Sequence, residues 1–194
     1  MEVRLRDDLR DIRDVLGKSA SEEARTSFRK FVPTSVMVYG VRLPVINELA
    51  RQYKAGGFDL AAALWGSGAF EEQLLAAKIL GFAARQDPER AVGLVREFSS
   101  GVTDWAVCDT LGMQSVKSIA GKSGGQIVEA ARQLAKSSQM WQRRLGVVLL
   151  THFAKDPSMR AELLSILKPL RLEKERYIKK ALTWIDKDLA KRDL

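Results

Sequence analysis

The chain has 194 residues, enough for one domain with a substantial core and too few for two domains of ordinary size. Its 32 Lys and Arg residues against 24 Asp and Glu residues give a net charge of +8, which favours an anionic partner, nucleic acid first. One cysteine and one histidine exclude an internal disulfide and argue against zinc–thiolate clusters, histidine-rich metal sites and serine–histidine triads. We therefore expect a single domain over 1–194 without a metal.

Apolar residues recur three and four positions apart along most of the chain, which predicts helices and no strands. Asp87 and Asp156 each precede a proline, as a helix-capping carboxylate does, and Ser19 stands in capping-box spacing to Glu22. The expected helices are 2–16, 21–31, 43–55, 59–66, 69–86, 88–99, 103–120, 124–136, 139–155, 157–168 and 173–191.

The single cysteine and the single histidine fit structural roles better than catalytic ones. Cys108 has no histidine near it in the sequence, which favours a buried apolar side chain over a nucleophile. His152 lies late in an apolar helix, where a packed histidine is expected. No apolar run reaches membrane-spanning length and the charged N-terminal segment has no signal-peptide core. These features predict no membrane association and a reducing, cytoplasmic setting.

An aromatic residue opens a similar helix four times, at Phe70, Trp105, Trp141 and Tyr177, at intervals of 35 or 36 residues. A repeat of this length that holds two helices is typical of α-solenoids of the HEAT or armadillo kind. Stacked helix pairs complete each other's core, and the four aromatic-led helices should line one surface. We predict an all-α solenoid of HEAT-like repeats, curved, with a basic concave face.

The position four residues after each aromatic is apolar in three repeats and acidic in one. The apolar members are Leu74, Leu145 and Ala181. The acidic member is Asp109, which shares a helix face with Trp105. An ionised carboxylate on a half-buried helix face is costly unless it is paired or used. Asp109 is therefore the first candidate for a functional residue.

Cations and further aromatics occupy matching positions on the next two repeated helices. Arg144 stands three residues after Trp141, and Lys180 and Trp184 stand three and seven residues after Tyr177. A carboxylate among aromatics and cations suits cleavage of a glycosidic bond to a cationic base, because its transition state is oxocarbenium-like. An alkylated base would lie against indoles by cation–π attraction, worth about 0.5–2 kcal/mol, and arginine would hold a backbone phosphate.

The same residues also have purely structural interpretations. Asp109 and Arg144 could form a buried ion pair that fixes the register of two helices. Trp141 and Tyr177 could pack between repeats, and Lys179 fits a solvated helix face that would also suit phosphates.

Four motifs in order resemble the AlkD-type alkylpurine DNA glycosylases of the DNA alkylation repair family. The segment 39–44 (Tyr-Gly-Val-Arg-Leu-Pro) resembles the family's entry to an early helix, and 104–109 (Asp-Trp-Ala-Val-Cys-Asp) resembles its Trp-x-x-x-Asp motif. The segment 141–144 (Trp-Gln-Arg-Arg) resembles Trp-x-Arg-Arg, and 177–184 (Tyr-Ile-Lys-Lys-Ala-Leu-Thr-Trp) resembles the family's late helix. The four motifs are spread over most of the chain.

The resemblance implies a cofactor-free enzyme that excises cationic N3- or N7-alkylated purines from duplex DNA. It implies Asp109 as the catalytic carboxylate, with Trp105 and Trp184 as aromatic walls of the site. We expect the protein to be a monomer. The residues expected to bind DNA are Arg143, Arg144, Lys179, Lys180, Tyr39 and Trp141. Two alternatives stay open: a non-catalytic repeat protein that binds distorted or branched DNA, and a protein-interaction scaffold.

Overall fold

The computed structural model describes residues 2–191, and among these residues there are helices and no strand. The α-helices are α1 (Glu2–Lys18), α2 (Glu22–Phe28), α3 (Leu43–Gln52), α4 (Gly57–Gly66), α5 (Phe70–Ala83), α6 (Pro88–Phe98), α7 (Trp105–Gln114), α8 (Gly124–Leu134), α9 (Met140–Leu150), α10 (Arg160–Leu167) and α11 (Arg176–Ala190). The short 3-10 turns are η1 (Lys54–Gly56), η2 (Ser99–Gly101), η3 (Thr151–Phe153), η4 (Pro157–Met159) and η5 (Pro169–Leu172).

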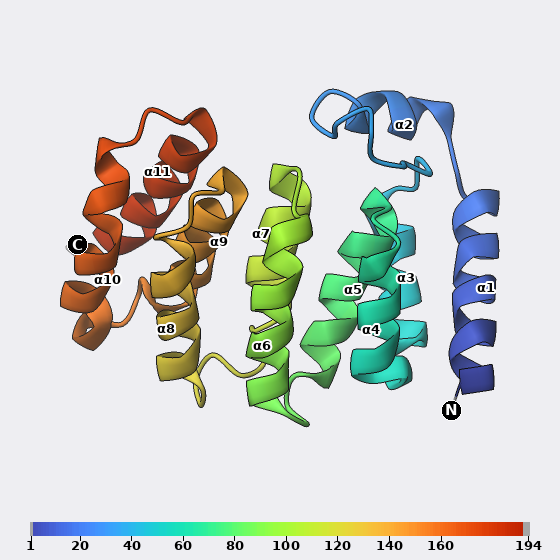
Figure 1. The fold of residues 1–194 in the computed structure, drawn as a ribbon, viewed down its shortest axis with the longest axis horizontal. Helices are drawn as coiled ribbons and strands as arrows, with labels where there is room; N and C mark the ends of the chain where they lie inside the picture. The colour runs from blue at the N-terminus through green and yellow to red at the C-terminus, as the bar shows by residue number, and fades with distance from the viewer. Residues whose placement is uncertain (1, 192–194) are drawn as a thin grey trace.

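The helices stack in a row of two layers (Figure 1). One layer is the series α3, α5, α7, α9 and α11, in which each helix contacts the next. The other is the series α1, α4, α6 and α8, and hairpin partners such as α4 with α5 and α8 with α9 join the two layers. Helix α2 lies across the upper edge of the row in Figure 1. The predicted all-α helical-repeat solenoid is confirmed.

The repeat register read from the aromatics also holds. Phe70 and Trp105 are the first residues of α5 and α7, and Trp141 and Tyr177 are the second residues of α9 and α11. The apolar residues four positions later are all buried, namely Leu74, Leu145 and Ala181. Each of these side chains lies in the core, so the corresponding position in α7, Asp109, is the exception that the sequence indicated.

Helix α5 is the most enclosed helix of the stack. Every residue from Phe70 to Ala77 is buried, because α3, α4 and α7 pack against the helix. The segment around α2 covers its first turn, where the rings of Phe28 and Phe31 lie 5.0 and 6.0 Å from the ring of Phe70. Within residues 2–191, no helix combines the length and apolar character needed to cross a membrane.

Helix α7 ends at Gln114, six residues before the predicted end of the helix at 103–120. The Ser115 hydroxyl donates to the Ala77 carbonyl of α5 at 3.1 Å, and the Ser118 hydroxyl donates to the Gly81 carbonyl at 3.0 Å. At Gly81 a Cβ atom would lie 2.3 Å from the Gln114 carbonyl oxygen, so only glycine permits this approach of α5 to α7. These contacts with α5 replace the last helical turns.

Helix starts follow the predicted capping chemistry with two corrections. Asp87 accepts a hydrogen bond from the Arg90 amide at 2.9 Å, as predicted, and Asp156 accepts one from the Ser158 amide at 2.9 Å. The Asp156 cap opens the 3-10 turn η4, so α10 itself begins later than predicted. The capping-box prediction for Ser19 is wrong, because Ser21 caps α2 through the Ala24 amide at 3.3 Å.

Helix α2 ends at Phe28, whereas the predicted helix ran to residue 31. The guanidinium of Arg29 donates to the carbonyls of Pro33 and Val36, both at 2.8 Å. These bonds hold the chain in a tight turn after α2, and the turn brings Phe31 onto α5.

Candidate functional site

The first turn of α7 is fixed by Asp104, a fully buried carboxyl group. Its Oδ1 atom accepts hydrogen bonds from the amides of Ala106 at 2.8 Å and Val107 at 2.9 Å, which start the helix at Trp105. Trp105 is 39% exposed, and Asp109, one turn later, keeps 23% of its side chain exposed. The cap therefore sets the direction of the helix that presents the indole and the acid.

The carboxylate of Asp109 is held through both of its oxygens by Arg144 of α9. Arg144 Nε donates to Asp109 Oδ1 at 3.0 Å and Nη2 donates to Oδ2 at 2.8 Å, which is the bidentate geometry of a strong pair. Nη1 donates to the Tyr177 carbonyl of α11 at 2.5 Å. The guanidinium thus links three consecutive repeats, and only 6% of the Arg144 side chain is exposed.

Arg144 was expected to bind a backbone phosphate, and its contacts show how much of the guanidinium is free to do so. The guanidinium is enclosed and three of its nitrogens already donate to protein oxygens. Its geometry is that of a residue that positions a carboxylate. This arrangement matches the ion pair that fixes helix register, which the sequence left open as an alternative. Asp109 nevertheless keeps a solvent-exposed edge, so pairing does not remove it from reach of a ligand.

Burial raises the pKa of Asp104, which caps α7, and of Asp109 within α7. For Asp109 the hydrogen bonds and the charge of Arg144 oppose the rise and only partly offset it. For Asp104 burial raises the pKa to about 6, the two backbone hydrogen bonds act against the rise, and the charge of Asp109 adds to it. The second carboxylate oxygen of Asp104 has no hydrogen-bond partner among the described residues. Two acids with raised pKa values therefore lie within one helical segment.

Two aromatic pairs lie on the elements that carry Asp109 and Arg144 or pack next to them. The Trp105 ring lies 5.0 Å from the ring of Phe31, which comes from the turn after α2. On α9 and α11, the rings of Trp141 and Tyr177 lie 4.8 Å apart and are tilted by 42°. Trp184 is half-buried two turns beyond Tyr177 on α11, and no ring contact joins it to Trp105 within residues 2–191.

Several residues expected to bind DNA instead have structural partners. Arg143 donates to the carbonyls of Ser137 and Ser138 at 3.0 and 2.8 Å and to the Glu173 carboxylate at 2.9 Å. Trp141 is half-buried in the contact with Tyr177. These contacts connect α9 to the segments on either side of it, so both side chains stabilise the stack.

Tyr39 also has a structural partner, because its hydroxyl donates to Glu72 at 2.8 Å. Arg13 of α1 holds the same carboxylate in a bidentate pair, with both distances 3.1 Å. Burial, followed by the Glu72 contact, raises the pKa of Tyr39 to about 12. The neighbouring Glu71 accepts hydrogen bonds from the amides of residues 39–41 at 2.7–3.0 Å. This cluster fastens the 39–41 segment to α5 and was not foreseen from the sequence.

By contrast, Lys179 and Lys180 are exposed on α11, as a phosphate-binding role requires. Neither ammonium group is in an ion pair among the described residues. Their DNA contact stays a prediction, since exposure permits such a contact and does not demonstrate it.

Cys108 and His152 occupy the packed positions expected for them. Cys108 is fully buried, and burial raises the pKa of its thiol well above the ordinary value. His152 lies with Nε2 3.0 Å from the Gly112 carbonyl oxygen, and burial lowers the pKa of its imidazole. Within residues 2–191, no group of three or more His, Cys, Asp or Glu side chains is placed to hold a metal ion.

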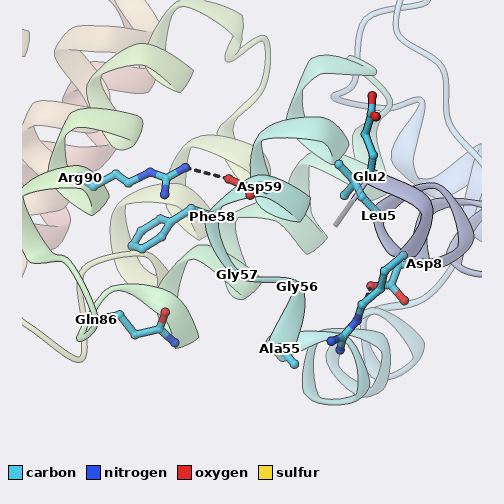
Figure 2. A pocket seen from close by; sticks show the side chains of 11 residues that line it. Glu2, Leu5, Asp8, Ala55, Gly56, Gly57, Phe58, Asp59, Gln86 and Arg90 are labelled. Atoms are coloured by element: carbon cyan, nitrogen blue, oxygen red, sulfur yellow. Dashed lines mark hydrogen bonds and ion pairs between the residues drawn. The ribbon is translucent and has the colours of Figure 1, made fainter.

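A cavity of about 480 Å³ lies away from this region, between α1, α4 and the start of α6 (Figure 2). Its charges are satisfied internally: Arg90 pairs with Asp59 at 2.8 Å and stacks over the Phe58 ring at 4.6 Å. Asp109 does not line this cavity. Its carboxylate is reached from solvent at its partly exposed edge.

The exposed indole and the partly exposed carboxylate together form a site suited to cationic groups. The carboxylate supplies a fixed negative charge, and the indole face attracts cations through its quadrupole. Because the pair is braced by Arg144 across three repeats, the charge is oriented before a ligand arrives. The chemistry that such a site supports is stabilisation of positive charge.

Comparison with known proteins identifies one family. No curated protein and no solved structure matches the chain. The sequence model of one family, described as DNA alkylation repair enzyme, matches residues 12–194 and so covers nearly the whole chain. The match includes every candidate residue described above, from Arg13 of the Glu72 cluster to Trp184. The chain therefore belongs to the DNA alkylation repair enzyme family.

Proposed function

We propose that this DNA alkylation repair protein is a DNA glycosylase that removes cationic N3- or N7-alkylated purines from duplex DNA. The observation that carries the proposal is the Asp109 carboxylate, held by Arg144 at 2.8 and 3.0 Å, partly exposed, and beside the exposed indole of Trp105. Family membership supplies the coarser statement, a DNA repair enzyme that acts on alkylation damage.

The reaction needs little beyond this site. The bond between the sugar C1′ and the base nitrogen breaks, and its electron pair goes to the alkylated base, which leaves as a neutral purine. Positive charge develops on the sugar, where Asp109 stabilises it, and water adds to C1′ and loses a proton to Asp109 or to solvent. Because the base is already cationic, no general acid is needed to protonate it.

The other residues take supporting roles in this proposal. Trp105 and Trp184 contact the sugar or the cationic base, and Arg144 orients the carboxylate. Lys179 and Lys180, which are exposed on α11, contact backbone phosphates. We further infer that 1–194 acts as one HEAT-like repeat domain and as a monomer on DNA.

A base-release assay tests the proposal. We expect the protein to release 7-methylguanine or 3-methyladenine from methylated duplex DNA and to leave abasic sites, with no release from the unmethylated duplex. Salt-sensitive binding of duplex DNA with no base release would reject the enzyme and favour the non-catalytic DNA-binding alternative. That alternative has one supporting observation, since both oxygens of Asp109 already accept hydrogen bonds from Arg144.

A further inference from the structure

A second groove, of about 590 Å³, lies where the C-terminal ends of α3, α5 and α7 meet. Five cationic side chains line it and no acidic side chain does. The cations are Arg51, Lys54, Lys78, Arg85 and Lys117. The groove is therefore positive over several repeats' width, whereas the cavity of Figure 2 contains both signs of charge.

The three lysines of this groove are the cations available to a ligand. Arg51 pairs with Glu48 at 2.5 Å, and Arg85 donates to the Ser118 carbonyl at 3.2 Å. Within residues 2–191, Lys54, Lys78 and Lys117 have no acidic partner. These three side chains are free to meet an external anion.

Lys78 is the least expected of the three. It is half-buried in α5, and burial lowers the pKa of its ammonium group with no carboxylate to offset the effect. Loss of solvent around a charged side chain favours a partner of opposite charge. An anion bound in the groove would supply the missing partner and restore the ordinary pKa.

An aromatic ring accompanies the cations. Phe82 is 48% exposed and stands four residues after Lys78, so the two side chains share one face of α5. Because Phe82 is this exposed, the outer edge of its ring does not pack in the core. A ring beside several cations is the combination that binds unpaired nucleic acid, since bases stack on the ring while the cations follow the phosphates. An acidic peptide would use the cations and leave the ring without a matching partner.

We propose that this groove binds an unpaired strand of DNA, with backbone phosphates on Lys54, Lys78 and Lys117 and a base stacked on Phe82. Within a duplex each base face is covered by a stacked neighbour, so the groove distinguishes unpaired segments from the interior of intact duplex. The groove lies at the C-terminal ends of the helices, whereas Asp109 lies in the first turns of α7. The proposal rests on the proposed function only in taking DNA as the partner.

Fluorescence anisotropy with three DNA probes tests the groove: a blunt duplex, the same duplex with a single-stranded overhang, and the single strand alone. The wild type should bind the overhang duplex at least about fivefold more tightly than the blunt one. Phe82→Ala should remove that difference, and Phe82→Leu should retain little of it. Lys78→Gln should weaken binding of the single strand about three- to tenfold and reduce its salt dependence by roughly 0.7 in the log–log slope.

Two matched variants control for general effects. Lys155→Gln removes an exposed lysine outside the groove, and Leu172→Ala removes an exposed apolar side chain, 87% exposed, also outside it. Both should bind all three probes like the wild type. Equal affinities for blunt and overhang duplexes, or unchanged binding by Phe82→Ala and Lys78→Gln, would overturn the proposal. Displacement of the single strand by polyglutamate at equal charge concentration would overturn it in favour of an acidic protein partner.

The same variants separate this inference from the glycosylase proposal. Base release from blunt methylated duplex together with groove variants that bind all probes normally rejects the groove alone. Absence of base release together with weakened overhang binding by the groove variants rejects the glycosylase and supports the groove. In either case folding is checked by the far-ultraviolet circular dichroism and the thermal midpoint of each variant.

Discussion

Asp109 owes its charge state to a neighbour 35 residues away in the sequence. Burial alone favours the neutral acid, and the bidentate contact with Arg144 favours the carboxylate. Because Arg144 is itself enclosed, removing either partner leaves a charge in a poorly solvated place. Stability and, under the proposed function, activity therefore depend on the same two side chains.

Replacing Arg144 by alanine should destabilise the protein by about 3–5 kcal/mol, the usual cost of breaking a buried ion pair from one side. The double variant Arg144→Ala with Asp109→Asn should be more stable than the single arginine variant, since it leaves no unpaired carboxylate. Urea unfolding of the wild type and the variants measures both effects. An arginine variant as stable as the wild type would show that the pair contributes nothing.

The raised pKa of Asp104 makes the free energy of unfolding depend on pH in a defined direction. Its pKa of about 6 in the folded state lies above the ordinary value of 3.8, so the folded protein binds the proton more tightly. Stability should fall as pH rises from about 4 to about 6, by roughly 3 kcal/mol for this group. Asp109, whose pKa is also raised, contributes in the same direction.

Asp104→Asn isolates the Asp104 contribution, because asparagine retains the capping oxygen and cannot ionise. The variant should lose less stability than the wild type between about pH 4 and about pH 7, as measured by urea unfolding at both pH values. Parallel losses in the two proteins would mean that Asp104 does not titrate in this window.

At the scale of helices, close packing of α5 on α7 depends on Gly81, which has no side chain. Gly81→Ala would place a Cβ atom 2.3 Å from the Gln114 carbonyl oxygen, a contact that backbone atoms cannot relieve by a side-chain rotation. We expect destabilisation of about 1–3 kcal/mol or more, as for other overpacked sites. Thermal and urea unfolding measure it.

Gly93→Ala is the control for this prediction. Gly93 lies exposed inside α6 with no atom within 4 Å of its would-be Cβ, so alanine should stabilise the helix by about 0.5–1 kcal/mol. Equal effects at Gly81 and Gly93 would contradict the packing account, because helix propensity alone treats the two positions alike.

The helices and their register were predictable because both follow from local chemistry. Caps such as Asp87 and the aromatic at each repeat can be recognised within one turn of sequence. The early end of α7 was not predictable, since it depends on Ser115 and Ser118 meeting carbonyls of α5 more than thirty residues earlier. Local spacing does not encode such contacts.

The candidate site was predictable in part, for the same reason. Asp109 could be recognised as a candidate because the equivalent positions in the other three repeats are apolar. Trp105 followed because it shares a helix face with Asp109. The contact of Arg144 with Asp109 remained one of two options, because arginine suits a phosphate as well as a carboxylate. The uses of Arg143 and Tyr39 in ion pairs and hydrogen bonds needed the fold, since Glu173 and Glu72 are about thirty residues away from them.

For the whole molecule, the excess of positive charge should appear as salt-sensitive DNA binding. Replacing the exposed Lys179 and Lys180 by glutamine should weaken duplex binding and reduce the log–log salt slope by roughly 1.8, about 0.9 for each phosphate that is no longer neutralised. Lys155→Gln, exposed between α9 and α10, is the control and should leave the slope unchanged. An unchanged slope in the double variant would place the phosphate-binding residues elsewhere.

Base release and DNA affinity in Asp109→Asn test the role of this carboxylate most directly. Single-turnover release of 7-methylguanine from methylated duplex should fall at least about 100-fold, since the variant has no fixed charge to stabilise the transition state. Duplex affinity should stay within about threefold of wild type. Asp59→Asn, an aspartate in an ion pair on α4, is the matched control and should release base normally. Wild-type release rates in Asp109→Asn would contradict the central claim that this carboxylate drives the reaction.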